Sequence, residues 1–172
     1  MKMRKTIFLI LSVIWMGVIF FQSAKVADRS AAESGGLIIF VGEHFVPGFD
    51  NWDEMKKQKF VEKYDHPVRK AAHVTEYAIL AMLLMGVFYE KPDSGKNTGK
   101  MPMSGVLSWI IATLYAATDE FHQTFVPGRS GEIKDVCFDS GGALIGIFVA
   151  LLLVIVIKYV FIKAGGCRKE DQ

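Results

Sequence analysis

Two apolar runs constrain this chain more than any other feature. Residues 6–24 contain no charged side chain, and residues 141–162 contain only Lys158, which stands close to the end of its run. An α-helix needs about 20 mostly apolar residues to cross the hydrocarbon core of a bilayer. A lysine near the end of such a helix can extend its ammonium group to the interface. Both runs therefore predict transmembrane helices.

Two shorter apolar segments complete a set of four. Residues 71–88 are apolar apart from His73, Thr75 and Glu76, and residues 101–118 carry no charge. Over the 172 residues, 51% are hydrophobic, 22% are charged and the mean hydropathy is +0.29. This composition excludes a disordered, collagen-like or coiled-coil chain. We expect one all-α membrane domain over residues 1–172, a bundle of four transmembrane helices in the cell membrane.

The basic residues indicate the orientation of the bundle. With the amino end inside, the inner segments 1–5, 89–100 and 158–172 hold ten of the 20 lysines and arginines, at about twice the density of the outer segments 25–70 and 119–140. The positive-inside rule then places both chain ends in the cytoplasm. Because the net charge is only +2 and the basic residues flank apolar runs, they indicate topology rather than a nucleic-acid surface. Alternatively, the first run is a cleaved signal peptide, which would leave three spans.

Residues 25–70 form the one large predicted outer loop. Residues 53–65 are rich in lysine and glutamate, and Phe60, Val61 and Tyr64 form one apolar stripe, which is typical of a helix lying on the membrane or on the bundle. In the last span, Gly142 and Gly146 are four residues apart, a spacing that lets helix backbones approach closely. Packing within the bundle and an oligomer contact both remain open for this pair.

Ionisable side chains gather at the predicted outer ends of the spans. His73 and Glu76 share one helix face, and Asp119, His122 and Gln123 share another. Glu120, Asp135 and Asp139 lie nearby in the sequence, and they could simply cap helix ends. Charged groups at membrane depth are costly and normally face the protein interior. A functional site and a purely structural polar clamp both fit this pattern.

The same residues allow several chemistries. Two histidines with carboxylates on facing helices could hold a divalent metal, although no strict metal motif is present. Without a metal, His122 with Asp119 or Glu120 could act as an acid/base pair, and Arg129 could bind a phosphate or a carboxylate through two hydrogen bonds. Cys137 is interpreted as a small apolar residue and not as a nucleophile. Whether the protein is an enzyme stays open.

Two blocks of the sequence resemble the signature blocks of the VanZ-like family. The first is Val68-Arg69-Lys70-x2-His73-x2-Glu76-Tyr77, and the second runs from Tyr115 through Asp119-Glu120-x-His122-Gln123 and Pro127-Gly128-Arg129 to Asp135, Asp139 and Gly142. The resemblance implies a small multi-span membrane protein whose founding relative is linked to low-level resistance to the glycopeptide teicoplanin. Most of the family lies outside resistance clusters, which implies a more general role in the cell envelope.

Together, residues and resemblance lead to one main functional hypothesis and two others. The protein acts on or binds a lipid-linked or cell-surface molecule at the outer leaflet and affects glycopeptide susceptibility. The candidate reactive residues are His73, Glu76, Asp119, Glu120, His122 and Asp135, and the candidate substrate-binding residues are Lys70, Tyr77, Gln123 and Arg129. Alternatively, it is a structural or accessory protein whose polar cluster only stabilises the bundle. A transporter is disfavoured because no polar path crosses the whole core.

Overall fold

The computed structural model describes residues 2–90 and 100–167 of the chain, and these residues form helices and no strand. The helices are α1 (Lys2–Ser23), α2 (Ala27–Phe45), α3 (Glu54–Phe88), α4 (Lys100–Gln123) and α5 (Ile133–Cys167), with a short 3-10 helix, η1 (Phe49–Asn51), between α2 and α3. The predicted all-α fold is confirmed.

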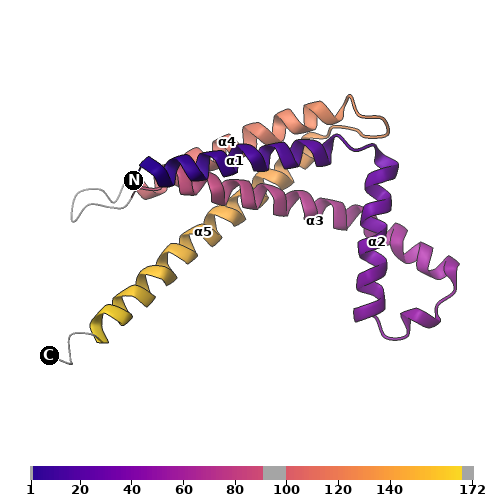
Figure 1. The fold of residues 1–172 in the computed structure, drawn as a ribbon. Coiled ribbons are helices and arrows are strands. Elements are labelled where there is room, and N and C mark those ends of the chain that lie inside the picture. The colour runs from indigo at the N-terminus through magenta and orange to yellow at the C-terminus, as the bar shows by residue number, and fades with distance from the viewer. Residues whose placement is uncertain (1, 91–99, 168–172) are drawn as a thin grey trace.

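Helix α3 is the centre of the bundle, since it packs against α1, α2, α4 and α5. Figure 1 shows α1, α3 and α4 running side by side, α5 diverging from them, and α2 crossing the end of the bundle that lies away from the amino terminus. The core between these helices consists of buried side chains, several of them alanines: Ile19, Tyr77, Leu80, Ala81, Leu84, Met85, Ala112, Ala116, Ala143 and Ile147.

Three helices are long and apolar enough to cross a membrane, judged by length and composition over the described residues: α1, α3 and α5, the last up to Val160. They correspond to the predicted spans 6–24, 71–88 and 141–162. Many large apolar side chains of α1 and α5 are exposed, as expected of helices that face lipid. Helix α4 contains the predicted span 101–118, but it is not among these three, and a fourth crossing stays a prediction.

The segment predicted as the outer loop, residues 25–70, is more helical than the sequence indicated. The predicted surface helix 53–65 and the span 71–88 form one continuous helix, α3, with Pro67 inside it. Proline removes one backbone hydrogen bond and usually kinks or ends a helix, but here the flanking helix-forming residues continue the helix. At 1.5 Å per residue, the 35 residues of α3 extend for about 52 Å, which exceeds the bilayer core of about 30 Å. The first turns of α3 therefore project beyond the span.

Aromatic packing fixes α2 against the projecting part of α3. Phe49 is 1% exposed, and its ring centroid lies 5.0 Å from that of Trp52 and 5.4 Å from that of Phe60. A Cβ atom on Gly42 of α2 would come within 2.5 Å of the Phe49 ring, so only glycine fits there. The carboxylate of Asp53 caps the start of α3 by accepting a hydrogen bond from the backbone N–H of Lys56 at 2.7 Å. The sequence analysis did not predict that α2 is a helix. The apolar stripe predicted within residues 53–65, which belong to α3, packs on this helix.

Gly142 and Gly146 of α5 let its backbone approach that of α3 closely. A Cβ atom on Gly142 would lie 2.4 Å from the carbonyl oxygen of Val74, and one on Gly146 would lie 2.0 Å from that of Ala78. Both positions therefore pack against the backbone of α3. The sequence left open whether this glycine pair serves packing within the bundle or an oligomer contact. In the structure, the pair packs within the bundle.

Candidate functional site

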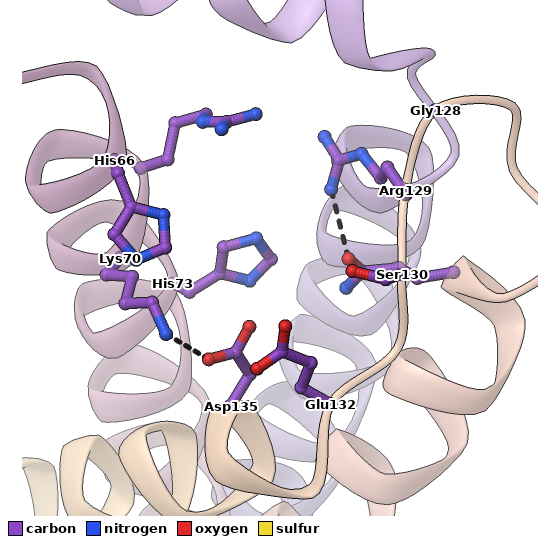
Figure 2. A pocket seen from close by; sticks show the side chains of 10 residues that line it. His66, Lys70, His73, Gly128, Arg129, Ser130, Glu132 and Asp135 are labelled. Atoms are coloured by element: carbon purple, nitrogen blue, oxygen red, sulfur yellow. Dashed lines mark hydrogen bonds and ion pairs between the residues drawn. The ribbon is translucent and has the colours of Figure 1, made fainter.

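A polar cavity of about 160 Å³ lies where α3 meets the connection between α4 and α5. Figure 2 shows His66, Lys70 and His73 on one side of it, and Arg129 and Ser130 on the other. Its lining comes from three parts of the chain: His66, Arg69, Lys70 and His73 of α3; Gln123 at the end of α4; and Gly128, Arg129, Ser130, Glu132 and Asp135 of the connection and α5. The structure therefore joins the two sequence blocks in one site.

The connection between α4 and α5 is built to present Arg129. Gly128 has a φ of +77°, in the left-handed region that non-glycine residues rarely adopt. The N–H of Arg129 then donates to the carbonyl oxygen of Val126 at 3.1 Å, closing the turn. A Cβ atom on Gly131 would lie 2.3 Å from the carbonyl oxygen of Glu120, so the connection also lies directly on α4. This geometry explains the Pro-Gly-Arg sequence of the second block.

Gln123 is the hub of a hydrogen-bond network beneath the cavity. Its amide nitrogen donates to Asp119 at 3.2 Å and to Glu120 at 3.1 Å, while its amide oxygen accepts from Nη1 of Arg129 at 3.3 Å. Gln123 itself is 6% exposed, so few water molecules can replace these bonds. We predicted Gln123 as a substrate-binding residue, and in the structure it both lines the cavity and orients the arginine.

The carboxylates of α4 are held by other elements as well. The hydroxyl of Ser23, at the end of α1, donates to Asp119 at 2.7 Å, and the backbone N–H of Glu132 donates to Glu120 at 3.1 Å. Asp119 and Glu120 are 3% and 6% exposed. These bonds tie α1, α4 and the start of α5 together, which is the structural role that we considered for the cluster.

Two arginines face the cavity with unused hydrogen-bonding capacity. Arg69 forms an ion pair with Asp65 at 3.2 Å, and Arg129 bonds to Gln123, but the Nε atoms of both are buried without a partner. Burial, and after it the positive charge of Arg69, lowers the pKa of Arg129, as expected for two guanidinium groups close together. An anion between them would satisfy both.

A second cavity, of about 200 Å³, adjoins the first. Arg69, His73 and Arg129 line both cavities, and Glu76 lines the second one only. Its other lining residues come from the end of α1, from α2 and from α3: Gln22, Lys25, Ser30, Glu33, Ser34, Leu37, Val68 and Ala72. Here Lys25 donates to Glu33 at 2.5 Å, and this bond lowers the pKa of the Glu33 carboxyl below its usual value. Helix α2 therefore contributes to the site.

The predicted pair His73 and Glu76 is present and buried from most solvent. Nδ1 of His73 lies 3.8 Å from a carboxylate oxygen of Glu76, and it has no hydrogen-bond partner. On the opposite side of His73, Lys70 forms an ion pair with Asp135 across the first cavity, as the dashed line in Figure 2 marks. Lys70, His73, Glu76, Asp135 and Arg129 are thus the predicted site residues that line the two cavities directly, together with Gln123.

The remaining predicted residues do not line either of these two cavities. The ring of His122 stacks on Phe20 of α1, with centroids 4.5 Å apart, and Tyr77 is fully buried in the core. Glu120 borders a third cavity of about 30 Å³, which also contacts Asp139 and has room for about one water molecule. His122 is therefore not among the residues that line the cavities beside His73 and Glu76. The spacing within α4 could not show this, because it fixes the face of the helix but not what packs on it.

The metal hypothesis gains no support from the donor geometry. Within residues 2–90 and 100–167, no three histidine, cysteine, aspartate or glutamate side chains come close enough to share one metal ion. The hydrogen bonds of Asp119 and Glu120 instead come from a hydroxyl, an amide and a backbone N–H.

Arg69 and His66 were missed as site residues. Both line the first cavity, and His66, Lys70 and His73 follow one another at helical spacing along α3. This spacing was available in the sequence, but the predicted helix 53–65 and the predicted span 71–88 left residues 66–70 outside any helix. Glu132 and Ser130 were also missed, because no pattern of the sequence distinguishes them from ordinary loop residues.

Comparison with known proteins gives one match. The model of the VanZ/LLP1 family matches residues 8–156, which include α2, α3 and α4, the greater part of α1 and α5, and the residues that line both cavities. No curated protein and no solved structure matches the chain. Because the family model covers most of the sequence, the chain belongs to the VanZ-like family of membrane proteins.

Proposed function

We propose that this VanZ-like protein binds an anionic group of a lipid-linked or cell-surface molecule at the outer face of the membrane, and that this binding lowers glycopeptide susceptibility. The observation that carries the proposal is the pair Arg69 and Arg129, which line both cavities and have buried Nε atoms without partners. A guanidinium group matches a phosphate or a carboxylate through two parallel hydrogen bonds. An unpaired buried donor is costly, so a bound anion would stabilise this arrangement.

The outer location is part of the proposal and rests on charge. Arg4 donates to the carbonyl oxygen of Tyr89, and Lys5 pairs with Glu90 at 2.9 Å, so the basic start of α1 lies at the opposite end of the bundle from the cavities. The higher lysine and arginine density of that end favours the cytoplasmic side. The cavities would then open at the outer leaflet, where envelope molecules and glycopeptides are found.

Proton transfer in the site is a role that His73 and Glu76 could fill. Both line the second cavity, beside Arg129, and the unpartnered Nδ1 of His73 lies 3.8 Å from the Glu76 carboxylate. An imidazole and a carboxylate next to a bound anion are the groups that general acid–base catalysis uses. Binding is nevertheless the part of the function that the geometry supports best.

The test is the minimum inhibitory concentration of teicoplanin in a susceptible Gram-positive host. Wild type should raise it, whereas Arg129→Gln and Arg69→Gln should lose most of this increase at equal membrane abundance. Losing one charge-assisted pair weakens binding by about 10- to 100-fold. Arg29→Gln is the matched control, because the side chain of Arg29 on α2 is 72% exposed and pairs with Glu33 at 3.7 Å. The proposal is wrong if both cavity variants keep the full wild-type effect.

A second candidate function is that of a structural or accessory protein. The network from Ser23 through Asp119 and Gln123 to Arg129 favours it, since these bonds connect α1, α4 and the following loop. In that case Arg129→Gln should lower the yield of folded protein in detergent. Under the binding proposal, the same variant should fold normally and lose only the phenotype.

A further inference from the structure

The first cavity is not uniformly cationic. Figure 2 shows Arg129 at one end of it and the carboxylates of Asp135 and Glu132 at the other, with the ring of His73 between them. Over the lining as a whole, Arg69, Lys70 and Arg129 are opposed by two carboxylates. A simple anion would therefore meet attraction at one end and repulsion at the other.

Most of these charges already have partners in the protein. Lys70 pairs with Asp135, and Arg69 pairs with Asp65. Among the described residues, Arg129 donates a side-chain hydrogen bond to the neutral amide of Gln123 and forms no direct ion pair, although the carboxylates of Asp119, Glu120 and Glu76 attract it from farther away. The carboxylate of Glu132 likewise has no ion pair among the described residues, so one guanidinium group and one carboxylate at opposite ends of the cavity lack a direct ion-pair partner.

We infer that the ligand of this cavity is a zwitterion that carries a phosphate and a primary ammonium group. This inference rests on the proposed function and specifies its ligand. The phosphate lies against Arg129 and Arg69, and the ammonium group lies against Glu132 and the second oxygen of Asp135. A tetrahedral phosphate has enough oxygens to accept hydrogen bonds from two guanidinium groups that belong to different elements, whereas a planar carboxylate has two.

The lining also selects the kind of ammonium group. Quaternary ammonium groups are recognised by aromatic side chains through cation–π contacts. No phenylalanine, tyrosine or tryptophan is among the described residues that line this cavity, whereas carboxylates are present. Carboxylates accept hydrogen bonds, which a primary ammonium group can donate and a quaternary one cannot. At about 30 Å³ per water molecule, the 160 Å³ correspond to about five waters, which suits a head group and not a large glycan.

The neighbouring cavity favours a membrane lipid as the source of this head group. The second cavity meets the first at Arg69, His73 and Arg129, and it adds the apolar side chains of Leu37, Val68 and Ala72. Leu37 belongs to a helix that also exposes Ile39, Phe40 and Val41, an apolar surface next to the site. The glycerol and upper acyl portion of a lipid could follow this path, whereas a soluble phosphoamine would not need it.

The experiment measures binding to the full-length protein in detergent by calorimetry. The probes are phosphoethanolamine, phosphocholine, glycerol 3-phosphate and ethanolamine. We expect phosphoethanolamine to bind about tenfold more tightly than the other probes, the value of one additional charge-assisted hydrogen bond. Glu132→Gln should remove this preference and leave glycerol 3-phosphate binding intact or stronger. Arg129→Gln should weaken every phosphate probe, and Glu43→Gln, an exposed site on α2, should change nothing.

The outcomes separate this inference from the proposed function. If wild type binds glycerol 3-phosphate as tightly as phosphoethanolamine, the anion site stands and the zwitterion inference is overturned. If no phosphate probe binds in solution, the same comparison is made in nanodiscs of phosphatidylcholine with phosphatidylethanolamine or with phosphatidylglycerol. Selective binding there assigns the ligand to lipid, and equal or absent binding overturns the inference.

Discussion

Replacing Gly146 by alanine should destabilise the bundle strongly, whereas the same replacement at Gly141 should not. The new Cβ atom at position 146 would lie 2.0 Å from the carbonyl oxygen of Ala78 and 2.7 Å from its carbonyl carbon. These are backbone atoms of α3, so no side-chain rotation can make room and the two helices must separate. Overpacking of this kind costs about 2–3 kcal/mol, equivalent to a fall in melting temperature of roughly 5–10 °C.

The control variant is Gly141→Ala, in which the higher helix propensity of alanine should raise stability rather than lower it. Alanine is a better helix former than glycine by about 1 kcal/mol, so a change without a steric clash should leave stability unchanged or raise it. Gly141 has no atom within 4 Å of the position that a Cβ would occupy. Thermal unfolding in detergent, followed by size-exclusion fluorescence, compares the two variants with wild type. Equal melting temperatures for Gly146→Ala and Gly141→Ala would show that α3 and α5 do not pack as described.

The spans could be predicted from the sequence because a bilayer imposes a length and an apolar composition on each helix. Residues 6–24, 71–88 and 141–162 satisfy both conditions, and they lie in the three helices able to cross a membrane. The extent of α3 could not be predicted in the same way. Pro67 is unfavourable inside a helix, so the local sequence does not predict that α3 begins before it. The packing of Phe60 against the aromatic residues around Phe49 explains this early start.

The sequence correctly predicted site residues whose position follows from their spacing along one helix. It did not predict those whose position depends on the packing between helices. The face shared by His73 and Glu76 follows from their positions three residues apart, and both line the second cavity. His122 was grouped with Asp119 by the same reasoning, yet its ring stacks on Phe20 of α1. The role of Glu132 depends on where Gly128 turns the chain, a three-dimensional property that one sequence does not reveal.

Replacing Gln123 by methionine should have the other large effect, because one amide group serves three charged side chains. Methionine keeps the length of the side chain but removes the bonds to Asp119, Glu120 and Arg129. Asp119 and Glu120 keep their bonds to Ser23 and to the backbone of Glu132, but each lost hydrogen bond to a charged group still costs about 1.5–3 kcal/mol. We expect a loss of about 3–5 kcal/mol in the free energy of unfolding, as for other disrupted buried polar networks. Thermal unfolding in detergent measures this loss.

Gln58→Met is the matched control for this change, since Gln58 is exposed on α3 and, among the described residues, its side chain bonds only to Glu62, at 3.4 Å. A wild-type melting temperature for Gln123→Met would contradict the network. Comparison with Arg129→Gln then separates stability from binding. Arg129 is the outermost member of the network, so its replacement should weaken phosphate binding in a protein that still folds. Gln123→Met should lose stability and binding together, because the amide that it removes both joins the carboxylates of α4 and orients the arginine.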